Sequence, residues 1–252
     1  MDLESRRRAV RPLLDEIKPA DALACYYAFY HPNNKTSLVP YPPDARNARG
    51  YIALSRTGLD LFRPLVTMRL PLDDHLAAAE LVRTALPSQA PAILTAPEDH
   101  APLLHAFFDV QTEERYRVLV LDRNRYQPVI NILVTQEESA NGLPRFVIRS
   151  RQDDNRVAAS AAINWQTPTF AEISVFTEAD QRRQGWGRSV VAALCQHVLE
   201  GGRTPLYAVG ENNRPSLQLA ENAGFVDSGL RRLLLQATRG PISSETQNSF
   251  QS

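Results

Sequence analysis

The chain has 252 residues, of which 43% are hydrophobic and 22% charged, a globular composition that excludes a mainly disordered protein. Its 28 Lys and Arg residues balance its 28 Asp and Glu residues, so no net charge draws it to nucleic acid or to an anionic membrane. Its length allows one large domain or two small ones, and its two cysteines provide neither a disulfide framework nor a metal site.

The first residues, MDLESRRRAVRPLLDEI, are charged where a signal peptide would be apolar. No run of about eighteen apolar residues occurs in the chain, so no membrane helix is predicted. We therefore expect a cytoplasmic, soluble protein without a metal, a nucleic-acid partner or a membrane partner. The sequence does not predict its oligomeric state.

The first half of the chain alternates helical and strand patterns, which predict one α/β lobe over residues 1–137. Asp21 is expected to cap the second helix, Asp73 or Asp74 the third, and residues 40–43 form a proline-rich loop. The predicted helices are residues 3–17, 21–31, 73–86 and 98–108, and the predicted strands are residues 50–56, 63–70, 91–95 and 115–123.

A segment that combines charge, Asn-Gly and proline, Glu137–Pro144, has turn or linker chemistry and predicts a domain boundary. The second domain then covers 143–236, and residues 237–252 form a polar tail. Three strands, a helix, a strand, a helix and a strand predict an α+β mixed sheet. The strands are residues 145–150, 156–165, 169–177, 206–209 and 225–236, and the helices are residues 187–199 and 215–222.

One loop of the chain has the residues of a binding site. After the strand that ends at Thr177, the chain reads Arg182, Arg183, Gln184, Gly185, Trp186, Gly187 and Arg188, and a helix begins there. A glycine loop at a helix N-terminus offers unpaired N–H groups and the positive end of the helix dipole, which together hold phosphate. Three arginines favour a ligand with several phosphate charges, such as a pyrophosphate.

Two common phosphate loops do not fit these residues. A Walker loop needs Gly-Lys followed by Ser or Thr, but Lys35 is the last lysine of the chain. A dinucleotide fingerprint would need its third glycine at Val190, and no supporting acidic residue follows. A tight strand-to-helix turn without any ligand remains an alternative for the two glycines.

The loop at 182–187 is followed by a helix, the strand LYAV and then ENNRPSLQLAENAGF, residues 211–225. In this order the motifs resemble the Gcn5-related N-acetyltransferase (GNAT) family over residues 143–236. The resemblance implies that acetyl-CoA or another acyl-CoA binds, with its pyrophosphate on the loop amides of 182–188 and its pantetheine beside the strand that ends near Thr177. It also implies that Asn213 contacts the cofactor.

The sequence departs from the family pattern in two places. Thr177 and Ala179 replace the usual Val-x-Pro step before the loop, and Ala220 stands where many members have a tyrosine that protonates the CoA thiolate. Ser216, one helical turn before Ala220, could orient a water or the sulfur. A polar residue in the first helical turn after Pro215 explains Ser216 equally well.

Glu172 is the predicted general base. Its strand alternates, with Ala171, Ile173 and Val175 on one face and Phe170, Glu172, Ser174 and Phe176 on the other. In the family a glutamate on this strand commonly deprotonates the amine, and burial would raise the pKa of Glu172 towards that of a working base. A solvated strand glutamate remains the alternative, because a bulge would change which side chains face the site.

These inferences predict an N-acyltransferase that moves an acetyl or other acyl group to an amine of a small molecule or peptide. A catalytically silent acyl-CoA-binding or regulatory module is the alternative, favoured by Ala220. A structural protein without a cofactor fits the paired motifs poorly. The N-terminal lobe, as a degenerate GNAT-like copy, would wall the acceptor site, as in two-lobed members similar to glycine N-acyltransferase.

Overall fold

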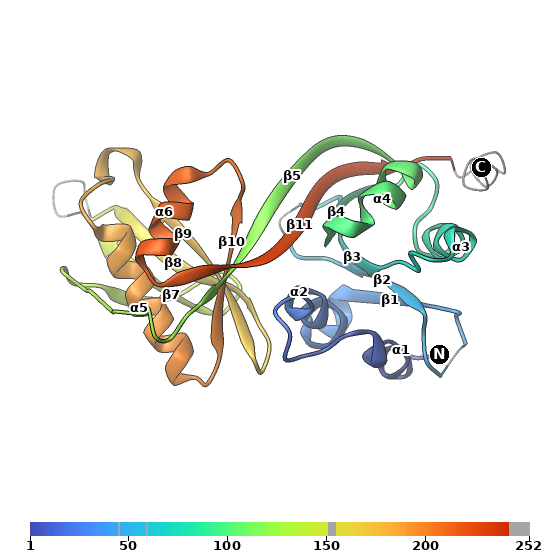
Figure 1. The fold of residues 1–252 in the computed structure, drawn as a ribbon, viewed down its shortest axis with the longest axis horizontal. Coiled ribbons are helices and arrows are strands. Elements are labelled where there is room, and N and C mark those ends of the chain that lie inside the picture. Colours follow the sequence, from blue (N-terminus) through green and yellow to red (C-terminus); the bar gives the residue numbers. More distant parts are fainter. Residues whose placement is uncertain (45, 59, 151–154, 242–252) are drawn as a thin grey trace. The chain divides into compact units, whose positions relative to one another are not determined.

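The computed structural model describes residues 1–44, 46–58, 60–150 and 155–241, and these form two compact units (Figure 1). Unit 1 contains Met1–Tyr116 and the chain from Arg231 onward, and unit 2 contains Arg117–Leu230. Both units combine helices with antiparallel and parallel strand pairs. The predicted α/β fold with a mixed sheet is therefore confirmed.

Unit 1 begins with two short helices and continues with strands and helices in alternation. Its sheet has the strand order β1-β2-β3-β4-β11-β5, in which β3 and β4 are parallel. Its elements are α1 (Leu3–Val10), α2 (Ala22–Cys25) with a π-helical continuation (Tyr26–Tyr30), β1 (Thr36–Tyr41), β2 (Gly50–Ser55), β3 (Leu65–Arg69), α3 (His75–Ala85), β4 (Pro91–Pro97), α4 (Ala101–Phe107) and the first part of β5 (Phe108–Leu121).

The sheet of unit 1 has a hydrophobic core on each face. Ile52, Val66 and Met68 pack in the core that contains α3 and α4, while Tyr51 and Ala53 pack in the core that contains α1 and α2. Alternate residues of β2 therefore serve opposite cores, as expected for a strand covered on both sides.

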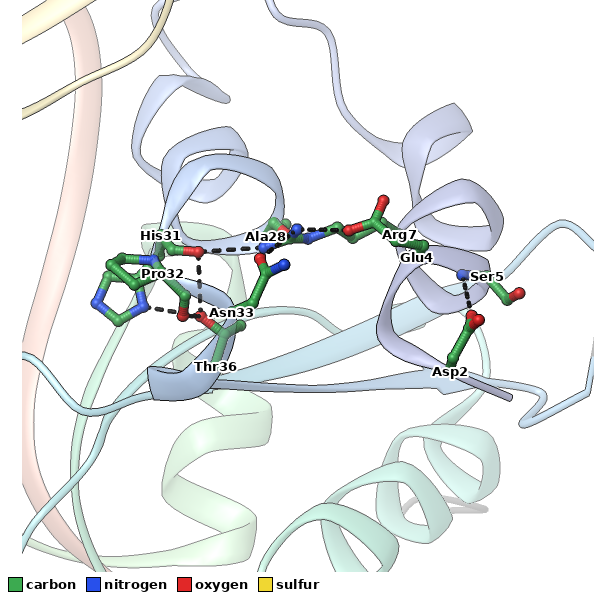
Figure 2. A network of polar contacts seen from close by, with 9 residues as sticks. All are labelled: Asp2, Glu4, Ser5, Arg7, Ala28, His31, Pro32, Asn33 and Thr36. Carbon is green, nitrogen blue, oxygen red and sulfur yellow. Dashed lines mark hydrogen bonds and ion pairs between the residues drawn. The ribbon is translucent and has the colours of Figure 1, made fainter.

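Arg7 ties α1 to the end of the second helical segment, as Figure 2 shows. Its guanidinium donates to the carbonyl oxygens of Ala28 and His31, at 3.0 and 3.1 Å, and to Oδ1 of Asn33 at 2.8 Å. The His31 ring is buried, and its Nδ1 lies 2.8 Å from Oγ1 of Thr36 at the start of β1. A charged side chain thus satisfies carbonyl groups that the helix end leaves unpaired.

His31 is expected to make folding sensitive to acid. Burial, together with the positive charges of Lys35 and Arg7, lowers the pKa of His31 from 6.5 to about 4. As the pH falls from about 6.5 to about 4, the unfolded chain binds a proton that the folded chain does not, so the free energy of unfolding falls by up to about 3 kcal/mol. Urea denaturation across this range should show a smaller loss for His31→Gln than for the parent. Equal losses would contradict this role of His31.

Unit 2 has the strand order β11-β5-β10-β9-β8-β7-β6. The pairs β6–β7, β7–β8 and β8–β9 are antiparallel, and β9–β10 is parallel. Besides the end of β5, its elements are β6 (Thr135–Glu138), β7 (Pro144–Arg149), β8 (Val157–Gln166), β9 (Phe170–Thr177), α5 (Trp186–Glu200), β10 (Thr204–Gly210), α6 (Arg214–Asn222) and the first part of β11 (Phe225–Arg239).

The core of unit 2 lies under α5, which packs on β7, β8, β9 and β10. Val190, Val191, Leu194, Cys195 and Val198 recur along α5 at helical spacing and are buried against the sheet. Ala171 and Ile173 of β9 belong to this core. The face of β9 that carries Glu172 is therefore the face away from α5.

The two units share one order of elements. In unit 1 three strands joined by antiparallel pairing, β1, β2 and β3, are followed by α3, the parallel strand β4, α4 and β5. In unit 2 the same order runs through β7, β8, β9, α5, β10, α6 and β11. The likeness lies in the topology, since the sequence shows no repeat.

Two long strands contribute to both units, and this changes the expected domain boundary. β5 belongs to unit 1 up to Tyr116 and to unit 2 from Arg117, while β11 passes from unit 2 to unit 1 at Arg231. The boundary therefore falls within strands, where linker chemistry gives no signal, and not between 137 and 143. The expected tail at 237–252 also begins too early, because Ala237–Arg239 still belong to β11; residues 242–252 lie outside the described part.

Three local expectations also differ from the structure. The first helix ends at Val10 and not near Ile17, because Pro12 has no N–H for a further helical hydrogen bond. The segment Glu137–Pro144 covers the end of β6, the hairpin turn and the first residue of β7, and it lies inside unit 2. The proline-rich loop begins within β1, an edge strand, where Pro40 is tolerated.

Candidate functional site

The loop between β9 and α5 has the backbone that a glycine position requires. After Thr177 a 3₁₀ turn, Ala179–Gln181, leads to Gly185, whose φ of 80° lies in the left-handed region. Gly185 is the N-cap of α5 and offers no side chain to the helix N–H groups. The first turn of α5 therefore keeps donors that a ligand can use.

Three arginines surround this helix start. Arg182 and Arg183 are exposed, Arg188 is half-buried in the first turn, and Nε of Arg188 is a buried atom without a hydrogen-bond partner. Within the described ranges none of the three forms an ion pair with a carboxylate. Positive side chains are unfavourable at the positive end of a helix dipole. An anion bound at this helix start would offset both positive charges.

Gly187 lies where β9, α5 and α6 come close together. A Cβ atom at this position would lie 3.1 Å from Oγ1 of Thr177 and 3.4 Å from Cδ2 of Leu219. Two other predicted residues of the loop contact other parts of the unit. Gln184 donates from Nε2 to Oε1 of Gln181 at 3.0 Å, and Trp186 packs against the core of unit 2.

The parallel strands β9 and β10 stop pairing before they end. Their paired residues run from Phe170 and Thr204 to Ile173 and Tyr207, yet β9 continues to Thr177 and β10 to Gly210. Ligands of open α/β sheets bind at the carboxyl ends of parallel strands, outside the sheet. Beyond this last pair β9 stays paired with β8 on its other edge, and the ends of β9 and β10 that no longer pair with each other lead to the first turns of α5 and α6.

Asn213 caps the second of these helices. Its Oδ1 accepts a hydrogen bond of 3.2 Å from the backbone N–H of Ser216, and the residue is exposed. This is the capping role expected of Asn at a helix start. The structure thus gives Asn213 a structural task at the position where the resemblance implies a cofactor contact.

Ser216 lies near a tyrosine that the sequence analysis did not select. Burial raises the pKa of the Tyr207 phenol, and the nearby Ser216 hydroxyl lowers it in part. Tyr207 packs edge-on against Phe225, and Ala220 is buried in the same core. The strand pattern LYAV marks Tyr207 as a core residue, so the sequence carries no signal of its proximity to Ser216.

Glu172 is a buried carboxylate with 7% exposure. It accepts a hydrogen bond of 3.1 Å at Oε1 from the indole Nε1 of Trp165, which is 3% exposed. The predicted alternation of β9 is present, but Phe176 is 51% exposed and does not cover the carboxylate. Glu172 lies in the part of β9 that pairs with β10, and the glycine loop follows the part that has separated from β10.

A metal-binding cluster and a membrane-spanning helix were also sought in the described part of the chain. Residues 1–44, 46–58, 60–150 and 155–241 contain no group of three or more His, Cys, Asp or Glu side chains that could hold a metal ion. In the same part of the chain, no helix has the length and apolar character needed to cross a membrane.

The comparisons with known proteins agree on one fold. Residues 154–232 match the family model described as FR47-like protein. A tandem GNAT protein from the clavulanic acid biosynthesis pathway superimposes with a TM-score of 0.57 and 14% identity, covering 96% of this chain and 95% of its own. No curated protein is similar enough in sequence to match.

Two further solved structures cover almost the whole chain. A GCN5-related N-acetyltransferase from Sphaerobacter thermophilus has a TM-score of 0.56 and 12% identity, covering 96% of this chain and 94% of its own. A Drosophila protein has a TM-score of 0.63 and 13% identity, covering 96% and 90%. Residues 154–232 thus carry an FR47-like domain, and the chain has the fold of the Gcn5-related N-acetyltransferases.

Proposed function

We propose that the protein is an N-acyltransferase that moves an acetyl or longer acyl group from acyl-CoA to an amine. One observation carries this proposal: β9 and β10 stop pairing at Ile173 and Tyr207, and β9 leads to an uncapped helix start surrounded by arginines. The GNAT fold supports it, because solved structures with this fold include GCN5-related N-acetyltransferases.

Acyl-CoA would lie along the end of β9, on the edge that has separated from β10. Its pyrophosphate would accept hydrogen bonds from the first N–H groups of α5, with Arg182, Arg183 and Arg188 supplying positive charge. The pantetheine would run beside the strand end at Thr177, and Asn213 would approach from α6. The remaining residues proposed for this site are Gln184, Gly185, Trp186 and Gly187.

In the transfer step the amine nitrogen attacks the thioester carbon, the C–N bond forms, and the C–S bond breaks with its electron pair on sulfur. Glu172 takes the proton that nitrogen loses, directly or through one water. Ser216 orients the sulfur or a water that protonates it, since Ala220 offers no hydroxyl. Tyr207, whose pKa burial raises, stays protonated next to Ser216 at neutral pH.

Only unit 2 is proposed to bind CoA. In unit 1 the corresponding helix, α3, is capped by Asp74, whose Oδ1 accepts from the N–H of Ala77 at 3.0 Å. This carboxylate would repel a phosphate. At the end of β3, the N–H of Leu70 donates to Nε2 of the buried His100 at 3.1 Å. Unit 1 is thus proposed to be a degenerate GNAT-like copy.

We therefore expect one CoA to bind per chain. Isothermal titration of the full-length protein with CoA should give a stoichiometry of one, since the helix start of α3 already has its own carboxylate cap. The variant Asp74→Ala, which removes this cap, should still bind one CoA at unit 2. A parent stoichiometry of two would contradict the division of roles between the units.

The acceptor is proposed to be an amine of a small molecule or a peptide in the cytoplasm. The balanced net charge of the protein does not favour a polyanionic acceptor. A screen of small amines, amino acids and aminoglycosides with acetyl-CoA, read as free thiol, tests the activity. CoA binding without thiol release for any amine would favour the second candidate, a catalytically silent acyl-CoA-binding module, which Ala220 supports.

A further inference from the structure

We propose that Trp165 is a positioning residue: its indole N–H holds the carboxylate of Glu172 in the orientation that accepts a proton. The proposal rests on the proposed function, in which Glu172 is the base. It adds a residue that neither the resemblance nor the motifs single out. The contact that carries it is the hydrogen bond of 3.1 Å from Nε1 to Oε1 between two buried side chains.

A bulge in β8 creates this contact. Ile163 pairs with Ile173, but the next pair of the ladder joins Trp165 to Glu172, so Asn164 is an extra residue in β8. In a regular ladder Asn164 would lie opposite Glu172, and Trp165 would lie opposite Ala171, on the core face under α5. The bulge therefore moves the tryptophan to the face of the carboxylate.

Both residues of the bulge serve that same face. Oδ1 of Asn164 accepts a hydrogen bond of 2.7 Å from Oγ of Ser174, which lies two residues after Glu172 on β9. Trp165 contacts Glu172 itself. Two side chains from consecutive residues thus fix the face of β9 that a regular strand would reach with only one.

A side chain from the β6–β7 turn supports the bulge. Nδ2 of Asn141 donates to the carbonyl oxygens of Ile163 and Asn164, at 3.0 and 3.2 Å, and its Oδ1 accepts from the N–H of Leu143 at 3.0 Å. These carbonyl groups flank the place where the ladder is interrupted. The turn expected to act as a linker thereby acts as a support for the bulge.

The hydrogen bond has a chemical consequence for a base. A donor to one oxygen fixes the plane of the carboxyl group and hence the direction of the lone pairs that take the proton. Loss of the indole N–H should therefore slow proton transfer without weakening the binding of acyl-CoA.

Trp165→Phe tests this, because it keeps an aromatic ring and removes the N–H. With acetyl-CoA and the amine that gives the fastest thiol release in the screen, kcat should fall about tenfold, the value of one hydrogen bond to a charged group. KM for acetyl-CoA should stay within about twofold.

The decisive comparison repeats Trp165→Phe in the Glu172→Gln background. If Trp165 acts through Glu172, Trp165→Phe slows the parent enzyme but causes almost no further loss in the Glu172→Gln enzyme, which has no carboxylate at this position. Equal slowing in both backgrounds would show that Trp165 has a packing role and would overturn the proposal. Slowing by Glu172→Gln with no effect of Trp165→Phe would overturn it as well, while the proposed function would stand.

A second variant keeps the proposal testable if Trp165→Phe does not fold. Asn141 is exposed, and Asn141→Asp keeps the acceptor for Leu143 but loses the two donors to the bulge. It should lower kcat about threefold in the parent and leave Glu172→Gln unchanged. An unchanged kcat in Asn141→Asp, or no turnover by the parent with any amine, would count against the proposal; the second result would also overturn the base role of Glu172.

Discussion

Turnover should fall by about 10²–10⁴-fold when Glu172 is replaced by glutamine, the usual loss when a general base is removed. Glutamine keeps the size of the side chain and an acceptor for the indole of Trp165, so the buried site should retain its packing. CoA affinity should stay nearly unchanged because the proposed pyrophosphate loop begins only beyond Thr177. Steady-state kinetics and calorimetry with CoA measure the two effects.

Glu178→Gln is the matched control. Glu178 follows β9 directly and lies 4.0 Å from Arg156 in an ion pair at the surface, which contributes little. Its loss should change turnover by less than about twofold. A Glu172→Gln enzyme with parental turnover would mean that the glutamate is structural and that another group, or solvent, takes the proton.

CoA binding should weaken by about 10- to 100-fold when Arg182 and Arg183 are both replaced by glutamate, since each reversal puts a negative charge near the proposed pyrophosphate. Both side chains are exposed, and within the described ranges neither is paired with a carboxylate, so the folded state should tolerate the change. Calorimetry with CoA at low salt measures the loss. The loss should shrink at high salt because exposed charges are screened.

Arg123→Glu provides the comparison for the loop variant. Arg123 is also exposed in unit 2, but it follows β5 near the end of α6 that lies away from the loop. The same change of charge there should leave CoA affinity within about twofold. Equal weakening by Arg123→Glu would show an effect of net charge, and unchanged affinity of the Arg182→Glu, Arg183→Glu variant would remove the proposed phosphate site.

Sequence patterns predicted the parts of unit 2 that depend on local spacing. The apolar stripe from Val190 to Val198 identifies the buried side of α5, and the alternation around Ile173 identifies the faces of β9. A glycine in the sequence indicates a backbone conformation that other residues avoid, and Gly185 has such a conformation, with a φ of 80°. The glycine loop and its helix were therefore predictable within about one residue.

Features that depend on how one segment pairs or packs with another were not predictable. The bulge at Asn164 exists only in the ladder with β9, and a single strand sequence does not reveal it. For that reason the sequence analysis did not select Trp165, and its hydrogen bond to Glu172 was missed. Tyr207 and Ser216 likewise come from a strand and a helix whose packing no local pattern specifies.

The two long strands also make the sheet of each unit depend on chain that begins in the other. In unit 2, β5 lies between β10 and β11, and in unit 1, β11 lies between β4 and β5. A fragment that starts at Leu143 would lack Leu119 and Leu121, which are part of the core under α5. Each unit thus supplies an inner strand to the other's sheet. A chain that lost either half would therefore lack strands that the sheet of the remaining half contains.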